Sequence, residues 1–473
     1  MIPNVDFEEN DEYRDRVATI DEKGKRKWVY AYKPTGRFYN ARTWLSLFYL
    51  IVFFGLPWVT YKGEPFMLLN ILERKFVVFG FVFWSQDFFL FGLTMILFVV
   101  FIIVFTVAFG RLFCGWACPQ TVFMEMVFRR IEYWIEGDAP KQKALDKMPW
   151  NSEKIRKRGL KIVLFYAVAF LVGNTFLAYI IGVEDLKKII SEPVSQHIGG
   201  LLAMMVFSGV FFGVYMWFRE QVCTVVCPYG RLQGVLMDRH SVVVAYDYIR
   251  GEPREKLRKN TERTAGDCID CNLCVNVCPT GSDIRNGTQL ECVHCTACID
   301  ACDSIMDRIN KPKGLIKYAS EATIADNKPF TITTRLKAYI VLLVALLGIW
   351  LAILTTRSTV DFQIRKAPGQ LYTITPEGDK VFSIYTVLMI NKSHKDFDSL
   401  TLKSDNPNYE LEWVDRNNYR HLKKESVHNG TIFIRIQRNK IQNRKDEFQI
   451  HLYNGEHLLE SENVVFLAPK PKK

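Results

Sequence analysis

The chain has 473 residues, of which 49% are hydrophobic, and its formal net charge is +11, from 61 lysines and arginines against 50 aspartates and glutamates. This length allows two or three domains of about 100 to 200 residues each. A basic excess is also typical of nucleic-acid-binding proteins. Here the basic residues lie between long apolar runs, so the composition indicates a membrane protein and no nucleic-acid partner.

Five uncharged apolar runs of 17 to 22 residues follow a charged N-terminal segment, residues 1–43. A helix of about 22 residues is about 33 Å long, enough to cross a hydrocarbon core of about 30 Å. Buried helices of a soluble protein are the alternative, which five such runs disfavour. The predicted membrane helices are residues 44–61, 88–109, 162–183, 198–218 and 338–354.

The lysine and arginine content of the connecting segments predicts their orientation. Segments 1–43, 111–159 and 219–335 contain 9, 10 and 16 such residues, whereas segments 62–87 and 184–197 contain 3 and 2. Positively charged loops stay on the cytoplasmic side. We therefore expect the N-terminus and the third of these segments in the cytoplasm, and the residues after the fifth helix outside it.

Two Cys-x-x-x-Cys-Pro motifs follow the second and fourth apolar runs, which indicates a duplicated two-helix unit. Cys114 and Cys118 form the first motif, and Cys223 and Cys227 form the second, 109 residues later. Cysteines at i and i+4 of a helix lie on one face, and the proline places the second cysteine near a helix boundary. Soft thiolates favour Cu(I), zinc or an iron–sulfur cluster over hard cations. Spacing does not choose among these, and buried structural cysteines are the other interpretation.

The remaining eight cysteines lie in residues 268–302, as two Cys-x-x-Cys-x-x-Cys-x-x-x-Cys runs. This is the spacing of bacterial ferredoxins, in which the fourth cysteine of each run binds the other cluster. We therefore predict two [4Fe-4S] clusters. The expected ligands are Cys268, Cys271, Cys274 and Cys302 for one cluster, and Cys292, Cys295, Cys298 and Cys278 for the other.

Zinc sites, disulfides and haem are weaker interpretations. Structural zinc sites normally use separated Cys-x-x-Cys pairs, and disulfides are rare in the cytoplasm. His294 lies inside the second run, where four cysteines already complete a site, so we expect a spacer. His197 lies at the outer edge of an apolar run and is expected to be interfacial. A membrane haem with two histidine ligands is therefore disfavoured.

Residues 357–473 have the pattern of a separate β domain. Short β-branched or aromatic runs alternate with turn residues at Asn406-Pro407, Asn429-Gly430 and Asn454-Gly455. About seven strands in about 115 residues predict a sandwich of immunoglobulin type. The segment has no cysteine, so we expect a docking or structural module. The clearest predicted strands are residues 381–390, 409–414, 431–436, 447–453 and 463–467.

The predicted fold is thus a multi-domain membrane protein. A bundle of five helices carries an inserted two-cluster ferredoxin domain of bacterial type and a C-terminal all-β, immunoglobulin-like sandwich. The predicted domains are a cytoplasmic segment (1–43), a membrane domain with four helices and both Cys-x-x-x-Cys-Pro motifs (44–235), a ferredoxin domain (236–335), a fifth membrane helix (336–356) and an extracytoplasmic sandwich (357–473).

Several stretches together resemble the cytochrome c oxidase accessory proteins of the CcoG/FixG type, which are polyferredoxin-like membrane proteins. They are DEKGKRKWVY at 21–30, GRF at 36–38, FCGWACPQ at 113–120, VCTVVCPYGRLQG at 222–234, the doubled ferredoxin run, CIDACDSIM at 298–306 and GLIKY at 314–318. The resemblance extends over nearly the whole chain. The absence of a proline after Cys302 is similar to the family's own pattern.

The resemblance implies a protein of the bacterial cytoplasmic membrane that serves assembly of a cbb-type haem-copper oxidase by reducing Cu(II) to Cu(I). It also implies that a transient copper ion is handled by four catalytic thiols, with the two clusters as an electron relay. Implied partners are the oxidase assembly machinery, copper transporters or chaperones and an unknown electron donor; a homodimer is left open. The implied copper-handling residues are Cys114, Cys118, Cys223 and Cys227.

Two other functions are compatible with the sequence. One is a quinol-dehydrogenase-like subunit that feeds an extracytoplasmic reductase, because such subunits share both cysteine patterns. The C-terminal domain, without redox residues, weighs against it. The other is a copper-binding assembly scaffold without turnover, in which the clusters are structural.

Overall fold

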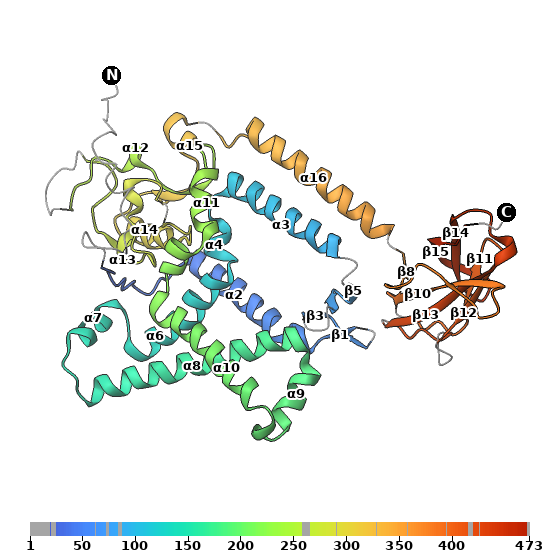
Figure 1. Ribbon diagram of the computed structural model, residues 1–473. Coiled ribbons are helices and arrows are strands. Elements are labelled where there is room, and N and C mark those ends of the chain that lie inside the picture. The colour runs from blue at the N-terminus through green and yellow to red at the C-terminus, as the bar shows by residue number, and fades with distance from the viewer. Residues whose placement is uncertain are drawn as a thin grey trace. The chain divides into compact units, whose positions relative to one another are not determined.

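The computed structural model describes residues 19, 25–61, 63–71, 75–83, 88–257, 265–289, 291–327, 329–356, 358–393, 395–414, 420–424 and 426–470 (Figure 1). Most of the first half of the predicted N-terminal segment therefore lies outside the described residues. The chain divides into two compact units. One comprises residues 1–59, 65–70 and 91–349, and the other comprises residues 60–64, 71–90 and 350–473.

Five helices in the described part of the chain are long and apolar enough to cross a membrane, as predicted. They are α2 (Arg37–Gly55), α3 (Phe88–Phe109), α8 (Ser152–Ile181), α10 (Ile198–Gly213) with its π-helical continuation η6 (Val214–Phe218), and α16 (Thr334–Thr355). Large apolar side chains on all five are exposed, which suits contact with lipid tails. The prediction of five spanning helices is therefore confirmed by length and composition.

Helices α2 and α8 begin earlier than the apolar pattern predicted, because charged residues before their apolar runs are paired inside the first unit. Arg42 of α2 is 5% exposed and donates a hydrogen bond from Nη1 to the carbonyl oxygen of Cys295, at 3.0 Å. Lys161 of α8 is 2% exposed and lies 2.6 Å from a carboxylate oxygen of Glu132. Charge pairing thus extends both helices beyond their lipid-facing parts.

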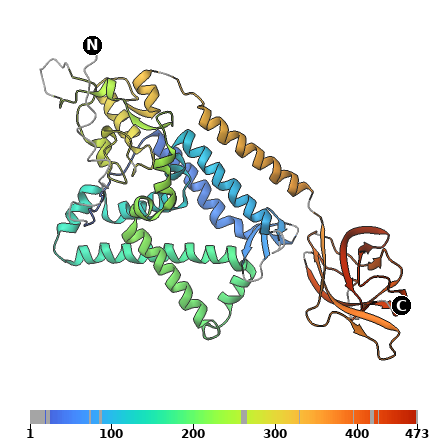
Figure 2. The ribbon, with the colours of Figure 1, turned by 45° about the horizontal axis from the view of Figure 1, so that its top comes forward.

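Aromatic contacts hold the helices of the first unit together. Phe176 of α8 stacks on Phe207 of α10 with ring centroids 5.9 Å apart, and the two helices lie against each other in both views (Figures 1 and 2). At the start of α16, Leu336 packs on Val107 and Ala108 at the end of α3. The fifth membrane helix therefore contacts the second where both approach the cysteine-rich segment.

Short elements connect these helices. Between α2 and α3 lie η2 (Leu56–Trp58) and β1 to β5 (Thr60–Tyr61, Glu64–Pro65, Met67–Asn70, Lys75–Val78, Phe81–Phe83). Between α3 and α8 lie α4 (Leu112–Trp116), α5 (Pro119–Thr121), η4 (Val122–Phe128), α6 (Arg129–Glu136) and α7 (Ala139–Lys147). Between α8 and α10 lie α9 (Val183–Ser191) and η5 (Val194–Gln196), and after η6 come η7 (Val222–Val226) and α11 (Pro228–Leu236).

The cysteine-rich segment is closed by two strands that flank it. β6 (Val243–Tyr246) precedes the cysteines, β7 (Ile316–Ala319) follows them, and the strands pair antiparallel with Val243 opposite Ala319. Between them lie α12 (Tyr248–Gly251), α13 (Leu273–Asn276), η8 (Ile284–Asn286) and α14 (Ala297–Arg308), and after them α15 (Glu321–Asp326). Met306, Leu315 and Ile316 form the core with several of the cysteines.

The first membrane helix docks directly on the cysteine-rich segment. The carboxylate of Asp300, in α14, accepts hydrogen bonds from the backbone N–H groups of Phe38 at 3.2 Å and Tyr39 at 2.8 Å. An acceptor at this place satisfies N–H groups that the first turn of a helix leaves free. Helix α2, within residues 1–59, and the cysteine-rich segment, within residues 91–349, belong to the same compact unit. The predicted boundaries at 44, 236 and 336 remain predictions.

The C-terminal part of the second unit is a two-sheet sandwich of antiparallel strands. One sheet has the order β12-β13-β10-β8, with β9 also paired to β10, and the other has the order β11-β14-β15. The strands are β8 (Val360–Lys366), β9 (Thr373–Ile374), β10 (Lys380–Asn391), β11 (Leu400–Ser404), β12 (Tyr409–Trp413), β13 (Val427–Gln437), β14 (Lys445–Asn454) and β15 (His457–Leu467), with η9 (Arg438–Lys440) after β13. The predicted immunoglobulin-like architecture is confirmed.

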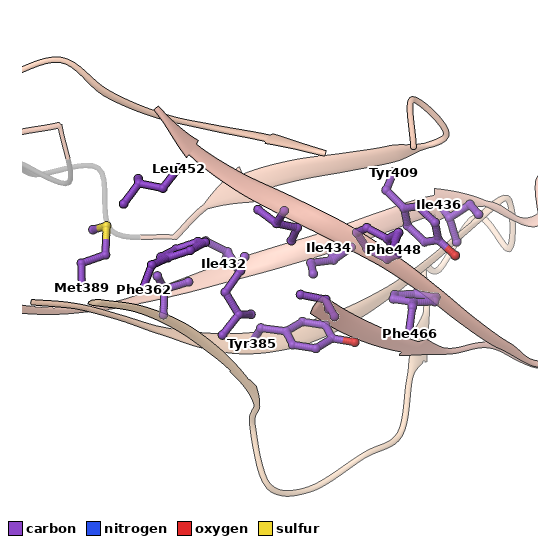
Figure 3. Close-up of a cluster of buried hydrophobic side chains, with 14 of the residues drawn as sticks. Phe362, Tyr385, Met389, Tyr409, Ile432, Ile434, Ile436, Phe448, Leu452 and Phe466 are labelled. Atoms are coloured by element: carbon purple, nitrogen blue, oxygen red, sulfur yellow. The ribbon is translucent and has the colours of Figure 1, made fainter. Parts of the chain in front are cut away.

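The sandwich core is apolar and is crossed by two tyrosines (Figure 3). Tyr409 of β12 stacks on Phe448 of β14, with ring centroids 4.1 Å apart. The hydroxyl of Tyr385, in β10, donates to the carbonyl oxygen of Val465 in β15, at 2.7 Å. Because each contact joins one sheet to the other, these tyrosines add hydrogen bonding and stacking to the burial that stabilises the sandwich.

Two of the three predicted turns in this domain are confirmed and one is wrong. Asn406-Pro407 separates β11 from β12, and Asn454-Gly455 joins β14 to β15. Asn429-Gly430 instead lies inside β13, opposite Leu388 and Val387 of β10. A Cβ on Gly430 would lie 2.4 Å from Cζ3 of Trp413. The glycine therefore marks a strand position that a neighbouring indole covers, not a turn.

We expect Gly430→Ala to destabilise the sandwich by about 1 to 3 kcal/mol, because the added methyl group overlaps the indole of Trp413. The penalty should shrink in a Trp413→Leu background, where the overlapping ring is absent. Hydrogen–deuterium exchange of the β12 and β13 amides in the four variants measures both effects. Equal penalties in the two backgrounds would contradict the explanation by overlap.

Candidate redox site

Two cavities lie in the cysteine-rich segment, and the cysteines divide between them. Four cysteines line the first, which we call cavity I: Cys268, Cys271, Cys274 and Cys302. The second, cavity II, is lined by Cys278, Cys292, Cys295 and Cys298, and also by Cys274. Each set of four that the spacing assigned to one cluster therefore surrounds one cavity. The fourth cysteine of each run has crossed to the other run's cavity.

The two runs repeat the same backbone conformation around their cavities. Asp270 and Asn272 in the first run have φ of 50° and 56°, and the equivalent His294 and Thr296 in the second have φ of 51° and 65°. Left-handed residues are uncommon outside glycine. Their recurrence at matching places turns the chain back on itself between successive cysteines. Helices α13 and α14 begin directly after Asn272 and Thr296.

The arrangement of the cysteines fits a polynuclear cluster. Among the described residues, no group of three or more His, Cys, Asp or Glu side chains is placed to hold a single metal ion. The thiols instead surround a space, and the other walls of cavity I are mainly apolar, with Ile305, Leu315 and Ile316 beside the polar Asn272 and Arg285. A cubane needs such a space, because its four irons are bound at separate corners.

The two cavities differ in exposure. Cys271 of cavity I is exposed, whereas Cys295 of cavity II is 8% exposed. Cavity II is covered by the Cys-x-x-x-Cys-Pro motifs: Cys114 and Cys223 pack against a cluster that includes Val293 and Cys295. A Cβ on Gly115 would lie 2.4 Å from the carbonyl oxygen of Val293. Only glycine allows the first motif to approach the second ferredoxin run this closely.

The two Cys-x-x-x-Cys-Pro motifs have matching local structures. Cys114 lies in α4 and Cys223 in η7, while Cys118 and Cys227 are the N-caps of α5 and α11. Both N-cap cysteines have extended backbones, and the following proline occupies the first helical position, where its missing N–H costs nothing. The predicted helix boundary at the second cysteine is confirmed.

The structure brings the four motif cysteines into one neighbourhood. Burial raises the pKa of Cys223 to about 12, and Cys118, Cys114 and Cys227 are near enough to raise it further. Burial likewise raises the pKa of Cys114 to about 11. Without a metal these thiols are protonated at neutral pH, and a metal that binds them must displace the protons.

Arg111 connects both motifs to the second ferredoxin run. Its Nε donates to Oε1 of Gln233, and its Nη2 donates to the carbonyl oxygen of Gly230, both in α11. Its backbone N–H donates to Nδ1 of His294 at 3.0 Å. Burial, with a contribution from Arg111, lowers the pKa of His294 to about 3, so the ring is neutral and can accept. Gln233 in turn donates from Nε2 to Sγ of Cys114, at 3.3 Å.

A buried ion network that the sequence analysis missed lies just before the second motif. Arg219 donates from Nη1 and Nη2 to the two carboxylate oxygens of Glu132, at 3.2 and 2.9 Å. Lys161 lies 2.6 Å from Glu132 and 3.2 Å from Glu136. Although burial opposes ionisation, Arg219 and Lys161 lower the pKa of Glu132 to about 2. The available signal was the placement of Lys161 and Arg219 at the ends of two apolar runs.

Three protein-family models match the chain. A 4Fe-4S binding domain matches residues 91–141, a 4Fe-4S dicluster domain matches residues 218–321, and the "IG-like fold at C-terminal of FixG, putative oxidoreductase" matches residues 350–469. Protein RdxA of Cereibacter sphaeroides is 34% identical over 385 residues, which cover 78% of this chain and 80% of RdxA. The chain belongs to the FixG family.

Two further relatives agree with this membership. Protein RdxB of Cereibacter sphaeroides is 32% identical over 386 residues, covering 78% of this chain and 80% of RdxB. Nitrogen fixation protein FixG of Rhizobium meliloti is 36% identical over 317 residues, covering 64% of this chain and 59% of FixG. The match thus spans less than two thirds of FixG itself.

Membership of the FixG family, the matched 4Fe-4S models and five spanning helices make the chain a membrane iron–sulfur electron-transfer protein. The dicluster model includes the eight cysteines of cavities I and II as well as Cys223 and Cys227. The 4Fe-4S model over residues 91–141 includes Cys114 and Cys118. A further cluster at the Cys-x-x-x-Cys-Pro cysteines therefore stays an alternative to copper.

The division of cysteines between the cavities predicts which substitutions share a phenotype. Cys302→Ala should remove the same cluster as Cys271→Ala, and Cys278→Ala the same cluster as Cys292→Ala, because each pair lines one cavity. Iron should fall from about eight to about four atoms per chain in each variant. The EPR spectra of the dithionite-reduced variants identify the remaining cluster.

Ser304→Ala, a substitution in α14 outside both cavity linings, is the matched control and should keep both signals. The assignment is contradicted if Cys278→Ala has the same remaining signal as Cys271→Ala. That result would mean that each run binds its own cluster.

Proposed function

We propose that the chain reduces Cu(II) to Cu(I) at the four Cys-x-x-x-Cys-Pro cysteines and supplies Cu(I) for maturation of a cbb-type cytochrome c oxidase. The observation that supports this most is the packing of Cys114 and Cys223 against the buried cluster that contains Val293 and Cys295, beside cavity II. Four soft thiols beside an iron–sulfur centre that transfers one electron suit copper, whose charge changes by one between Cu(II) and Cu(I).

Thiol chemistry favours copper in its reduced state. Cu(I) is a soft ion that thiolates bind well, whereas hard cations prefer oxygen ligands. Each Cu(II) takes up one electron, and Cu(I) then displaces protons from the buried thiols that hold it. Iron–sulfur clusters in cavities I and II supply one-electron transfer when bound.

The surrounding residues of the chain position the thiols. Gln233 donates a hydrogen bond to Cys114, and Arg111 holds Gln233 and the backbone of Gly230. Hydrogen bonds to sulfur and its supporting groups fix the direction of a ligand and tune the metal that it binds. Burial keeps water away from the thiols, which protects Cu(I) from competing oxygen ligands.

The proposal includes an orientation and partners. The N-terminus and the ferredoxin segment face the cytoplasm, because their segments have most of the lysine and arginine. The sandwich lies on the opposite side of a bacterial cytoplasmic membrane. Its lack of cysteine suits a docking module for the oxidase assembly machinery or for a copper transporter or chaperone.

The direct experiment is anaerobic purification of the chain followed by addition of Cu(II) to the dithionite-reduced protein. We expect about eight irons with matching acid-labile sulfide, loss of the reduced-cluster EPR signal on Cu(II) addition, and one Cu(I) formed per electron lost. A reduced protein whose EPR signal is unaffected by Cu(II) would contradict copper reduction. The scaffold function would then be the better account.

Cysteine substitutions separate copper handling from the clusters. Cys114→Ala and Cys227→Ala should lower Cu(I) affinity by at least about tenfold, since each removes a ligand. Both should keep about eight irons and both reduced-cluster signals. A competition titration with a Cu(I) chelator measures the affinity. Val225→Ala, in η7 between the cysteines of the second motif, is the matched control. Loss of iron in the cysteine variants would mean that these residues bind a cluster instead.

A further inference from the structure

A third cavity, cavity III, lies beside the first Cys-x-x-x-Cys-Pro motif and has a volume of about 450 Å³. Its walls come from α2, α3, α4, α11 and β7 and are mostly aromatic, with Phe38, Phe105, Trp116, Tyr229 and Tyr318 among them. Small-molecule sites typically have volumes of about 300 to 1,000 Å³ and apolar walls with a few polar groups. Nothing in the function proposed above uses this cavity.

Cavity III lies at the level of the lipid. Phe101, Ile102 and Phe105 line it from α3, within the last turns of a candidate membrane span. Phe101 is 49% exposed, so its ring forms part of the cavity wall and also of the outer surface of the span. A ligand of this cavity would therefore enter from the bilayer and carry apolar substituents.

The cavity also offers hydroxyl groups. Nε1 of Trp116 donates to the hydroxyl oxygen of Tyr318 at 3.1 Å, while the Tyr318 hydroxyl proton has no acceptor among the described residues. Burial raises the pKa of Tyr318, so the hydroxyl keeps its proton. Tyr49 lines the same cavity and has no hydrogen-bond partner in the described ranges. These donors suit oxygen atoms on a ring, and an acyl chain would leave them unused.

Two walls of cavity III also belong to the core around the clusters. Phe38 contacts Trp116 and Tyr318 edge to face, with centroids 6.3 and 6.1 Å apart. Phe38 and Tyr318 pack against the core that contains Cys268 and Cys274 of cavity I. Trp116 lies between the two cysteines of the first motif. A ligand here would contact Phe38 and Tyr318, which pack on that core, and Trp116 of the first motif.

We infer that cavity III binds the ring of an isoprenoid quinol, which is the electron donor for copper reduction. The ring, its two oxygens and its apolar tail match the aromatic walls, the tyrosine hydroxyls and the lipid-level opening. One quinol loses two electrons and two protons to become the quinone. Two Cu(II) ions take one electron each, and the protons pass to water. This inference rests on the copper reduction proposed above and names its donor.

The test fills the cavity in the full-length, cluster-loaded protein in lipid nanodiscs. Ile102→Trp places an indole in cavity III, whereas Ile96→Trp makes the same change on an exposed part of α3. Binding of decylubiquinone and of a short-chain menaquinone is measured by calorimetry. We expect Ile102→Trp to weaken binding at least about tenfold and Ile96→Trp to leave it unchanged, because an overfilled cavity excludes the ring.

A second variant probes the hydroxyl. Tyr318→Phe should weaken quinone binding by about threefold to tenfold, the loss expected for one hydrogen bond. Tyr166→Phe, on α8, is the matched control. Equal quinone affinity in Ile102→Trp and Ile96→Trp, or no binding by the unmodified protein, would overturn the inference.

Reduction assays separate this inference from the proposed function. Decylubiquinol should reduce the clusters of the unmodified protein and of Ile96→Trp, and should fail with Ile102→Trp. Dithionite-reduced Ile102→Trp should still reduce Cu(II), because only the donor site is filled. If quinol fails to reduce the clusters of the unmodified protein while dithionite reduces them, the donor assignment alone is overturned. Failure of every reduced form to reduce Cu(II) overturns copper reduction, while quinone binding to cavity III would stand.

Discussion

The hydrogen bonds of Arg111 join three parts of the chain that are far apart in sequence. Its side chain donates to Gln233 and Gly230 in α11, directly after the second motif, and its backbone N–H donates to His294 of the second ferredoxin run. Arg111 is 2% exposed, and a buried charge is stable only when nearby groups satisfy its donors. The side chain and the backbone N–H of Arg111 together connect the membrane motifs to the second ferredoxin run beside cavity II. The positions of the four motif cysteines depend on this connection.

Charge pairing also explains how membrane helices and a ferredoxin segment form one unit. Glu132 pairs with both Arg219 and Lys161, so α8 and the end of η6 are tied to α6. Removing one partner of a buried pair typically costs about 3 to 5 kcal/mol, since the other charge remains buried. Asp300 and Arg42 likewise tie α2 to the cysteine runs. Paired charges thus join these helices to one another and to the cysteine-rich segment, so the two parts form one unit instead of separate domains connected by a linker.

Periodicity and spacing in the sequence correctly predicted the features that residues close together in the chain determine. The length of the uncharged runs predicted the five spanning helices, and the alternation of short strand-like runs with turn residues predicted the sandwich. The proline after the second cysteine of each motif predicted the helix boundaries at Cys118 and Cys227. The prediction was wrong where a residue distant in the sequence determines the structure. Asn429-Gly430 has the pattern of a turn, but Gly430 lies in a strand and is covered by the indole of Trp413. Likewise Arg111 and Glu132 are ordinary charged residues in the sequence. Their structural roles depend on which helices lie together in the folded chain, and the spacing of residues within one segment does not predict that.

The two cavities have unequal surroundings, so the redox site has one exposed end and one covered end. Cavity I has an exposed cysteine, Cys271, and shares Cys274 with cavity II. Cavity II is covered by the motifs that contain Cys114 and Cys223. An electron that arrives at either cavity can therefore reach the other through neighbouring cysteines. The buried thiols, where soft metals bind best, lie at the covered end. The copper chemistry proposed above would thus take place where water is excluded, while Cys271 of cavity I is exposed.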